Sequence, residues 1–461
     1  MKLSRRLFLA ESLVALGSAS IALSACQPKA TPAPAEGAET APTKAPTAAP
    51  VAEDPGKVRF LERHSTAFGH VWERAIEAYN EKFPDVEVER IQPAGGTSHQ
   101  EKLTAMVAGG DTPDVYWTTW DWIVYQRQGF FRNLTPTMEA EGFDPREKYE
   151  PQWIDMWKQE DGDYGLPWDA FIFMLNYHKD MFDEKGIAYP KDNEASTWAE
   201  VLEMGKGLTE WNDKIPVTLG TQAWRPYWGI WWIWMVQAGF QLYDAGMTKV
   251  NLEDPKLWEM FDFFGEWGWK HKVEPTSAIQ TDLPLNFDSG TIGTSIMATC
   301  QWSGTRNLAT WNWDVSPFPQ WTNDGDPKVL GWTCPVVVLE DGPNPDNAWE
   351  FLKEACGPKA YLAMYEEGMT LPTLKEHTDP VVKTFLDAKP PDNNTMNIEW
   401  ARYMVTDVPW NNGAWQTILG IINDALGQVY LGEMKAEQAM TEIAIPQCDK
   451  ALKDLTEAGT I

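Results

Sequence analysis

Short hydrophobic runs alternate with stretches of helical spacing from residue 57 onward. Residues 58–61 predict a strand, and the apolar positions from Trp72 to Phe83 recur every three or four residues until Pro84 ends the helix. Residues 86–89 alternate with period two, and a third strand is expected at 113–116. This order predicts a parallel sheet with helices on both faces.

Helix starts are marked by capping boxes. Ser98 precedes Glu101 by three residues, as Thr197 precedes Glu200, and each pair predicts that a helix begins there. Ligands of parallel sheets bind beyond the carboxyl ends of the strands, so the loops at 64–65 and 118–122 are candidate binding loops.

The rest of the chain predicts a second α/β unit. Residues 171–177 form a continuous apolar run suited to a buried strand, and Asn344 with Pro345 predicts the cap and first position of a helix. The tail from 413 to 455 predicts two helices that separate near Gly432. A helix from about residue 226 is aromatic all round, which favours core positions for Trp231, Trp232 and Trp234.

The first 55 residues predict targeting and tethering. Residues 1–25 have a charged start, a short apolar middle and small residues at a cleavage site, as a signal peptide does. Residues 4–9 (SRRLFL) resemble a twin-arginine export signal, and 23–26 (LSAC) resemble a lipoprotein box in which Cys26 is lipidated. An ordinary secretory signal with an accidental cysteine is the alternative. Residues 26–55, rich in Ala, Pro and Thr, form a linker after Cys26.

Composition narrows the functional classes. The 461 residues include 38 Lys and Arg against 67 Asp and Glu, and the net charge of −29 argues against nucleic acid as a partner. The lack of a long apolar run after residue 25 argues against an integral membrane protein. The unusual number is 26 tryptophans, which directs attention to ligands that stack on flat apolar rings.

Neither a metal, a cofactor nor a catalytic motif is expected. Besides Cys26, the cysteines are Cys300, Cys334, Cys356 and Cys448, which have no metal-binding spacing and allow three pairings or free buried thiols. The run Asp161-Gly162-Asp163 lacks the spaced ligands of a calcium loop and predicts a turn.

Six segments in order resemble the extracellular solute-binding proteins of bacterial ABC importers, in particular the sugar-binding, maltodextrin-like type. They are 75–84 (AIEAYNEKFP), 102–115 (KLTAMVAGGDTPDV), 164–167 (YGLP), 175–182 (LNYHKDMF), 197–202 (TWAEVL) and 344–352 (NPDNAWEFL). The resemblance implies an α/β, two-lobed periplasmic-binding-protein-like (type II) fold with a hinge and a ligand cleft between the lobes. It places lobe 1 at 57–167 plus 320–372 and lobe 2 at 168–319 plus 373–461. It also implies a monomer that delivers its ligand to an ABC permease and touches the membrane through its lipid anchor only.

A sugar is held by flat apolar rings and planar hydrogen-bonding groups, and these types gather at predicted cleft positions. Their alternative roles are core packing for each Trp, a helix cap or solvated loop for each Asp, and an ordinary surface position for His64. Trp302, Trp332 and Trp410 fall where the resemblance implies ligand contacts. The predicted ligand-binding residues are His64, Trp120, Asp121, Trp168, Asp169, Trp224, Trp228, Trp302, Trp332 and Trp410.

The sequence therefore predicts a receptor without enzymatic activity that closes around a carbohydrate by hinge motion. One alternative is a receptor of the same fold for a polyamine, another cation or a glycerol phosphate. A cation would use Asp121 and Asp169 with aromatic walls, and an anion would use Arg63, Arg225 or Arg306. A second alternative is a carbohydrate-active hydrolase, which would need two carboxylates on either side of a scissile bond.

Overall fold

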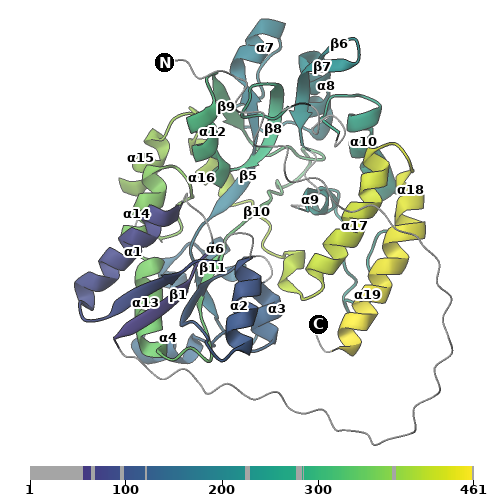
Figure 1. Ribbon diagram of the computed structural model, residues 1–461. Helices are drawn as coiled ribbons and strands as arrows, with labels where there is room; N and C mark the ends of the chain where they lie inside the picture. The colour runs from purple at the N-terminus through teal and green to yellow at the C-terminus, as the bar shows by residue number, and fades with distance from the viewer. Residues whose placement is uncertain are drawn as a thin grey trace, which may run out of the picture. The chain divides into compact units, whose positions relative to one another are not determined.

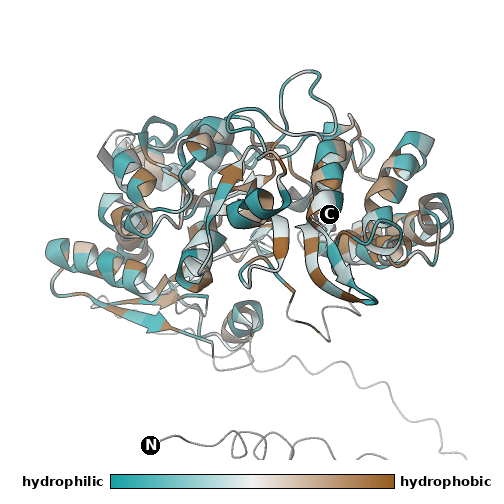
Figure 2. Ribbon diagram, turned by 90° about the horizontal axis from the view of Figure 1, so that it is seen from above, coloured by the Kyte–Doolittle hydropathy of each residue, from teal (hydrophilic) through white to brown (hydrophobic). Residues whose placement is uncertain are grey.

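The computed structural model describes residues 56–63, 68–93, 98–119, 122–223, 229–276, 283, 285–375, 380–458 and 461. Within them the strands form two separate sheets, which Figure 1 shows with helices around each. Figure 2 shows hydrophobic (brown) stretches on strands and helices next to hydrophilic (teal) ones, and the buried core includes Phe60 of the first sheet and Phe173 of the second. The core is therefore built from both sheets.

The first sheet has five strands and mixed direction. Three strands from the early chain run parallel, and two further strands pair with them or with each other in the antiparallel sense. In spatial order they are β2 (Glu87–Ile91), β1 (Lys57–Leu61), β3 (Val115–Trp117), β11 (Pro335–Val338) and β4 (Gly165–Pro167).

Helices cover both faces of this sheet, as the early strand and helix order predicts. In β3, the ring of Tyr116 lies 5.8 Å from that of His99, which begins helix α2, whereas the ring of Trp117 lies 5.4 Å from that of Trp72 in α1. Successive side chains of a strand point to opposite faces, so these two helices lie on opposite sides. The helices of this part are α1 (Gly69–Lys82), α2 (His99–Ala108), α3 (Trp122–Arg127), α4 (Thr135–Glu141), α5 (Pro145–Lys148), α6 (Pro151–Asp155), α13 (Pro345–Ala355) and α14 (Pro358–Glu366), with α15 (Pro380–Asp387) packed on α14.

The second sheet is centred on a long strand that is buried along its whole length. Its strands, in spatial order, are β10 (Gly331–Trp332), β5 (Phe171–His178), β8 (Ile292–Ala298), β7 (Ile215–Gln222) and β6 (Glu210–Asn212), and β9 (Trp313–Ser316) also pairs with β5. Only β7 and β8 are parallel neighbours among the described pairs.

Aromatic side chains fill the space between this sheet and its helices. Trp231, Trp232 and Trp234 of α9 are at most 2% exposed, which confirms the core positions predicted for them. Its helices are α7 (Lys179–Lys185), α8 (Trp198–Leu208), α9 (Ile230–Gln237), α10 (Pro255–Trp269), η3 (Thr299–Gln301), α12 (Trp302–Leu308), α16 (Thr395–Ala401), η5 (Pro409–Asn411), α17 (Trp415–Tyr430), α18 (Ala436–Gln438), η6 (Ala439–Ala444) and α19 (Ile445–Glu457).

The two capping boxes are present as predicted. The Ser98 and Thr197 hydroxyl oxygens each accept a hydrogen bond from the backbone N–H three residues later. In turn, the Glu101 and Glu200 carboxylates accept from the backbone N–H groups of Ser98 and Thr197. The cap expected at Asn344 forms differently. Its backbone N–H donates to the buried carboxylate of Asp114, which also accepts from Arg59 and so joins α13 to β1.

In the described part of the chain, none of the helices combines the length and the apolar character needed to cross a bilayer. The residues predicted as signal peptide and linker, Cys26 included, lie outside the described residues.

Candidate functional site

Three chain segments pass side by side between the two sheets. Residues 168–170 connect β4 to β5, and 333–334 connect β10 to β11. The third segment, at 370–371, bonds to the first, because the Leu371 N–H donates to the Ala170 carbonyl at 2.7 Å and the Ala170 N–H donates to the Thr370 hydroxyl at 2.7 Å. A movement of one sheet against the other therefore acts on these segments. The lobe boundaries given above stay a prediction.

Asp169, a predicted ligand-binding residue, lies on the first of these segments. Its carboxylate accepts a hydrogen bond of 2.6 Å from the Cys334 N–H on the second segment. The side chain is 6% exposed, and this burial raises the pKa of Asp169 to about 6, against the lowering effects of the Cys334 bond and of Arg63 nearby. Asp169 therefore links the 168–170 segment to the 333–334 segment by a hydrogen bond, and it loses its proton at a pH of about 6.

Arg63 follows β1 and faces the same place. Its guanidinium lies 4.7 Å from the centre of the Trp117 ring, and its Nη1 donates to the Cys334 sulfur at 3.7 Å. Burial, and secondarily the charge of Arg63, lower the pKa of His99 to about 3, so that imidazole is neutral at physiological pH. We call the place where residues 168–170, 333–334 and 370–371 pass side by side the junction. It holds the cation of Arg63 close to the buried carboxyl group of Asp169.

Trp168, next to Asp169, is enclosed by other rings. It stacks on Trp72 with ring centres 4.3 Å apart and planes 11° from parallel, and it also contacts Trp117 and Phe68. The side chain has no exposed surface. One face of the indole is therefore covered by Trp72, and its predicted contact with ligand stays a prediction.

Trp332 and Trp410 are brought together although 78 residues separate them. Their ring centres are 6.0 Å apart at 76°, and Trp332 also meets Phe171 edge to face at 4.6 Å. Trp410 meets Trp232 at 5.4 Å. In each of these edge-to-face pairs the edge of one ring lies against a face of the other, and the two rings are not stacked plane to plane. Trp332 is 7% exposed and Trp410 is 3% exposed.

Trp302 lies apart from both groups, at the start of α12. It is fully buried and meets Trp313 at 5.9 Å. The Gln301 side chain accepts from the Ala298 N–H and holds the turn that precedes it. The remaining predicted ligand-binding residues, His64, Trp120, Asp121, Trp224 and Trp228, lie outside the described residues.

Sequence reasoning did not single out Cys334 or Trp117 for the junction. A cysteine without a spaced partner carries no sequence signal, and Trp117 could be recognised only by its place at the end of a strand. From the sequence, Arg63 is a candidate partner for an anionic ligand only.

The described residues show neither a metal centre nor a disulfide. Within the described ranges, no three His, Cys, Asp or Glu side chains gather closely enough to hold a metal ion. Cys300, Cys334, Cys356 and Cys448 are free thiols. Asp161 accepts from the Tyr164 hydroxyl and Asp163 pairs with Arg146, so the run around Gly162 is a turn, as predicted.

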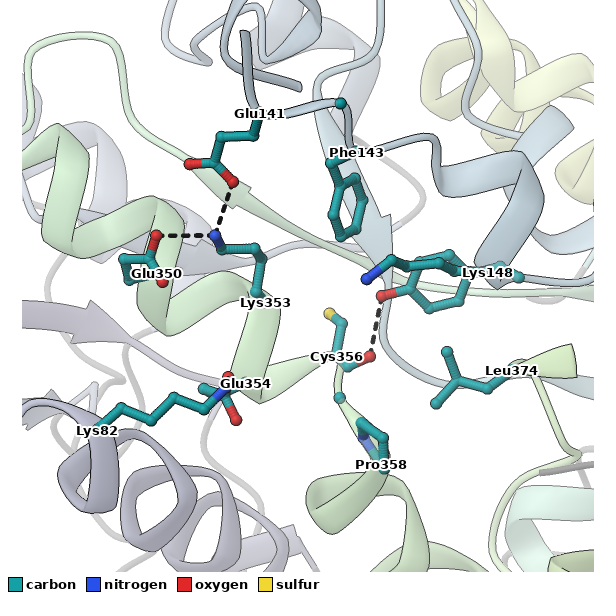
Figure 3. A pocket seen from close by; sticks show the side chains of 13 residues that line it. Lys82, Glu141, Phe143, Lys148, Glu350, Lys353, Glu354, Cys356, Pro358 and Leu374 are labelled. Atoms are coloured by element: carbon teal, nitrogen blue, oxygen red, sulfur yellow. Dashed lines mark hydrogen bonds and ion pairs between the residues drawn. The ribbon is translucent and has the colours of Figure 1, made fainter. Parts of the chain in front are cut away.

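A pocket of about 500 Å³ lies beside α13 and α14, and its lining includes none of the described residues that are predicted to bind ligand (Figure 3). Five of its six charged side chains form ion pairs with one another, since Lys353 contacts Glu141 and Glu350 and Lys82 contacts Glu354. The sixth, Lys148, lies over the Phe143 ring. Because most of the charge of the lining is neutralised, the pocket does not compete with the junction as the main site.

The comparisons with known proteins agree on the architecture. The arabinooligosaccharide-binding protein of Halalkalibacterium halodurans is 22% identical over 208 residues, which is 44% of this chain and 44% of that protein. The match thus spans less than half of that curated relative.

Two solved structures align over most of the chain. An ABC substrate-binding protein from Listeria monocytogenes in complex with cycloalternan has a TM-score of 0.75 and 22% identity, over 87% of this chain and 100% of that one. The UgpB protein of Mycobacterium tuberculosis in complex with glycerophosphocholine has a TM-score of 0.70 and 16% identity, over 88% and 100%. These likenesses confirm the predicted two-lobed α/β fold of the type II periplasmic binding proteins.

The family model described as bacterial extracellular solute-binding protein matches residues 64–361, which is more than half of the chain. On this match, the chain belongs to the bacterial extracellular solute-binding proteins.

Proposed function

We propose that the protein captures a carbohydrate between its two lobes and delivers it to the permease of an ABC importer. The observation that carries the ligand class is the meeting of Trp332 and Trp410 at 6.0 Å, edge to face, beside the connection between β10 and β11. Indole faces bind the C–H faces of sugars, and Asp169 and Arg63 supply planar hydrogen-bonding groups at the junction.

The related proteins support this ligand class. The curated relative is named for arabinooligosaccharide binding, and the solved structure from Listeria contains cycloalternan. We assign ligand contacts to Asp169, Trp332 and Trp410. We also keep His64, Trp120, Asp121, Trp168, Trp224, Trp228 and Trp302 as proposed contacts.

The proposed mechanism is binding without chemical change. A ligand that touches both lobes stabilises the closed arrangement by its higher affinity for it, and the permease recognises that arrangement. We further propose that the chain acts as a monomer and that lipidated Cys26 holds it at the outer face of the cell membrane. Replacing Cys26 with Ser should then move the protein from the membrane fraction to the soluble fraction.

A second candidate ligand is a small zwitterion or cation. The solved structure from Mycobacterium contains glycerophosphocholine, and at the junction the carboxyl group of Asp169 lies near the cation of Arg63 and the ring of Trp117. Such a ligand would use ion pairing and cation–π contact in place of hydroxyl hydrogen bonds.

A ligand panel distinguishes these candidates. Arabinotriose, maltotriose, glycerophosphocholine and spermidine would be compared by thermal shift and titration calorimetry. A ligand at about 1,000 times its Kd stabilises the folded protein by about 4 kcal/mol, which raises the Tm. We expect a trisaccharide to raise the Tm and to be recovered unchanged. If only glycerophosphocholine or spermidine raises the Tm, the second candidate ligand is supported in place of a carbohydrate. Cleavage of the glycan would show that the protein is an enzyme.

A further inference from the structure

A groove runs along the second sheet's side of the molecule, apart from the junction. It consists of two adjoining hollows, of about 510 and 730 Å³, which share the side chains of Gln241 and Asp407. We call it the outer groove. Each hollow alone has the size of a small-molecule site, which is about 300–1,000 Å³.

Aromatic rings line both ends of the outer groove. The aromatic residues Trp232 and Tyr243 line the smaller hollow together with the aliphatic ring of Pro409, and Tyr403 lines the larger one. The Arg402 guanidinium lies 4.7 Å from the centre of the Tyr403 ring and donates to the Tyr403 hydroxyl. This contact holds a flat, partly apolar surface in place at that end.

Polar side chains occupy the middle and the rim. Gln241 and Asp407 are exposed, and in the described part of the chain their side chains form neither a hydrogen bond nor an ion pair. Asp326 and Lys328, at the larger hollow, are likewise without a side-chain partner among the described residues. The groove thus combines flat apolar rings with planar amide and carboxylate groups, the combination that suits a sugar's C–H faces and hydroxyls.

The outer groove is separated from the predicted ligand site by one layer of rings. Trp232 lines the groove and meets Trp410 at 5.4 Å, and Trp410 in turn meets Trp332. Behind the larger hollow, the backbone at Val405 bonds to Val329, two residues before β10. The groove therefore lies behind the ring layer to which the proposed interlobe contacts belong.

We propose that the outer groove is a second carbohydrate site, which binds a glycan independently of the interlobe site. It rests on the proposed function only for the ligand class. Its lining comes from the second sheet's side alone, because Asp326 and Lys328 lie just before β10 of that sheet, although the predicted boundaries count them with lobe 1. Such a site would hold sugar chains near the receptor whether the lobes are open or closed.

Calorimetry with trisaccharides tests this, because the ring layer of Trp232, Trp410 and Trp332 separates the two sites and each site would take its own trisaccharide. The groove variant is Gln241→Ala with Asp407→Ala, which removes exposed side chains and so leaves folding intact. The matched control is Gln128→Ala with Asp85→Ala, which makes the same chemical change at exposed positions elsewhere. Trp332→Phe is the variant of the interlobe site. Arabinotriose and maltotriose are titrated into the full chain, and hydrogen exchange of residues 402–409 reports the groove.

We expect two trisaccharides per chain for the parent and the control, and one for the groove variant, with at least tenfold weaker binding at the lost site. Protection of residues 402–409 should persist in Trp332→Phe and disappear in the groove variant. A stoichiometry of one that the groove variant leaves unchanged would overturn the proposal while the interlobe function stands. If the groove variant loses all trisaccharide binding while Trp332→Phe keeps it, the groove is the binding site and the interlobe function is contradicted. Protection by spermidine but by neither glycan, or no glycan binding at all, would also overturn it.

Discussion

Two tryptophan clusters lie on either side of the junction, and they pack in different ways. Trp168 and Trp72 stack face to face at 4.3 Å, with Trp117 against them, whereas Trp332, Trp410 and Trp232 meet by their edges. Face-to-face stacking covers one face of both rings, whereas an edge-to-face contact covers a face of only one of the two. The same residue type thus suits the core near the first sheet and ligand contact near the second.

The largest effect should come from the stacked cluster. Trp168→Ala removes a side chain with no exposed surface and leaves a cavity beside Trp72 and Trp117. We expect the free energy of unfolding to fall by about 3–5 kcal/mol, measured by urea denaturation. Trp269→Ala, at a position 40% exposed, is the control and should cost much less. Equal losses in the two variants would contradict the packing role given to Trp168.

The charge of Asp169 should give the next largest effect. Its pKa is raised from 3.8 to about 6 in the folded protein, so the carboxyl group favours folding most below pH 4, and this contribution is lost as pH rises through 6. At about 1.4 kcal/mol per pH unit, the contribution amounts to about 3 kcal/mol. Asp169→Asn should remove this pH dependence and be more stable than the parent above pH 6.

The comparison is made by thermal denaturation between pH 4 and pH 8. Asp85→Asn, which removes one exposed carboxylate, should follow the parent curve. If Asp169→Asn keeps the parent's slope in that range, another group is responsible for it.

Ligand affinity should respond to the edge-packed cluster. Trp332→Phe and Trp410→Phe keep an aromatic ring but reduce its flat area, so each should weaken trisaccharide binding by about tenfold. Trp168→Phe should lower stability and weaken affinity less than Trp332→Phe does, because one face of the Trp168 ring is covered by Trp72. An affinity loss in Trp168→Phe as large as in Trp332→Phe would remove the difference between the clusters.

The smallest effects should come from the two capping boxes. Ser98→Ala and Thr197→Ala each remove one cap, at helices of the first and second sheet, and each should lower the free energy of unfolding by about 1 kcal/mol. Neither should change ligand affinity. A loss of affinity in one variant alone would show that its helix takes part in binding.

Local features of the fold were predictable from the sequence. The capping boxes at Ser98 and Thr197, the buried strand β5 and the break at Gly432 depend on residues close in the chain, and all are present. The antiparallel entry of β11 between β3 and β4 was not predicted, because β11 and β3 are more than 200 residues apart. The hydrogen bond between Asn344 and Asp114 was not predicted either, because the two residues are 230 positions apart in the sequence.

The candidate site was predictable in residue type more than in geometry. The family resemblance implied that Asp169 follows a lobe boundary and that Trp332 and Trp410 fall at positions of ligand contact, and the structure brings the last two together. The sequence could not show that Trp168 stacks on Trp72, since ring orientation depends on packing between α1 and the first sheet. It also could not reveal the pairing of Asp169 with Cys334, which are 165 residues apart.

The central place of β11 in the first sheet has a consequence for synthesis on the ribosome. The second sheet has all its strands once residue 332 has emerged, but the first sheet lacks the strand between β3 and β4 until residue 338. The part of the protein made first is therefore among the last to finish its hydrogen-bonded ladder. A translating chain carries an open strand edge for more than 200 residues, and a chaperone that shields such edges would act within that interval.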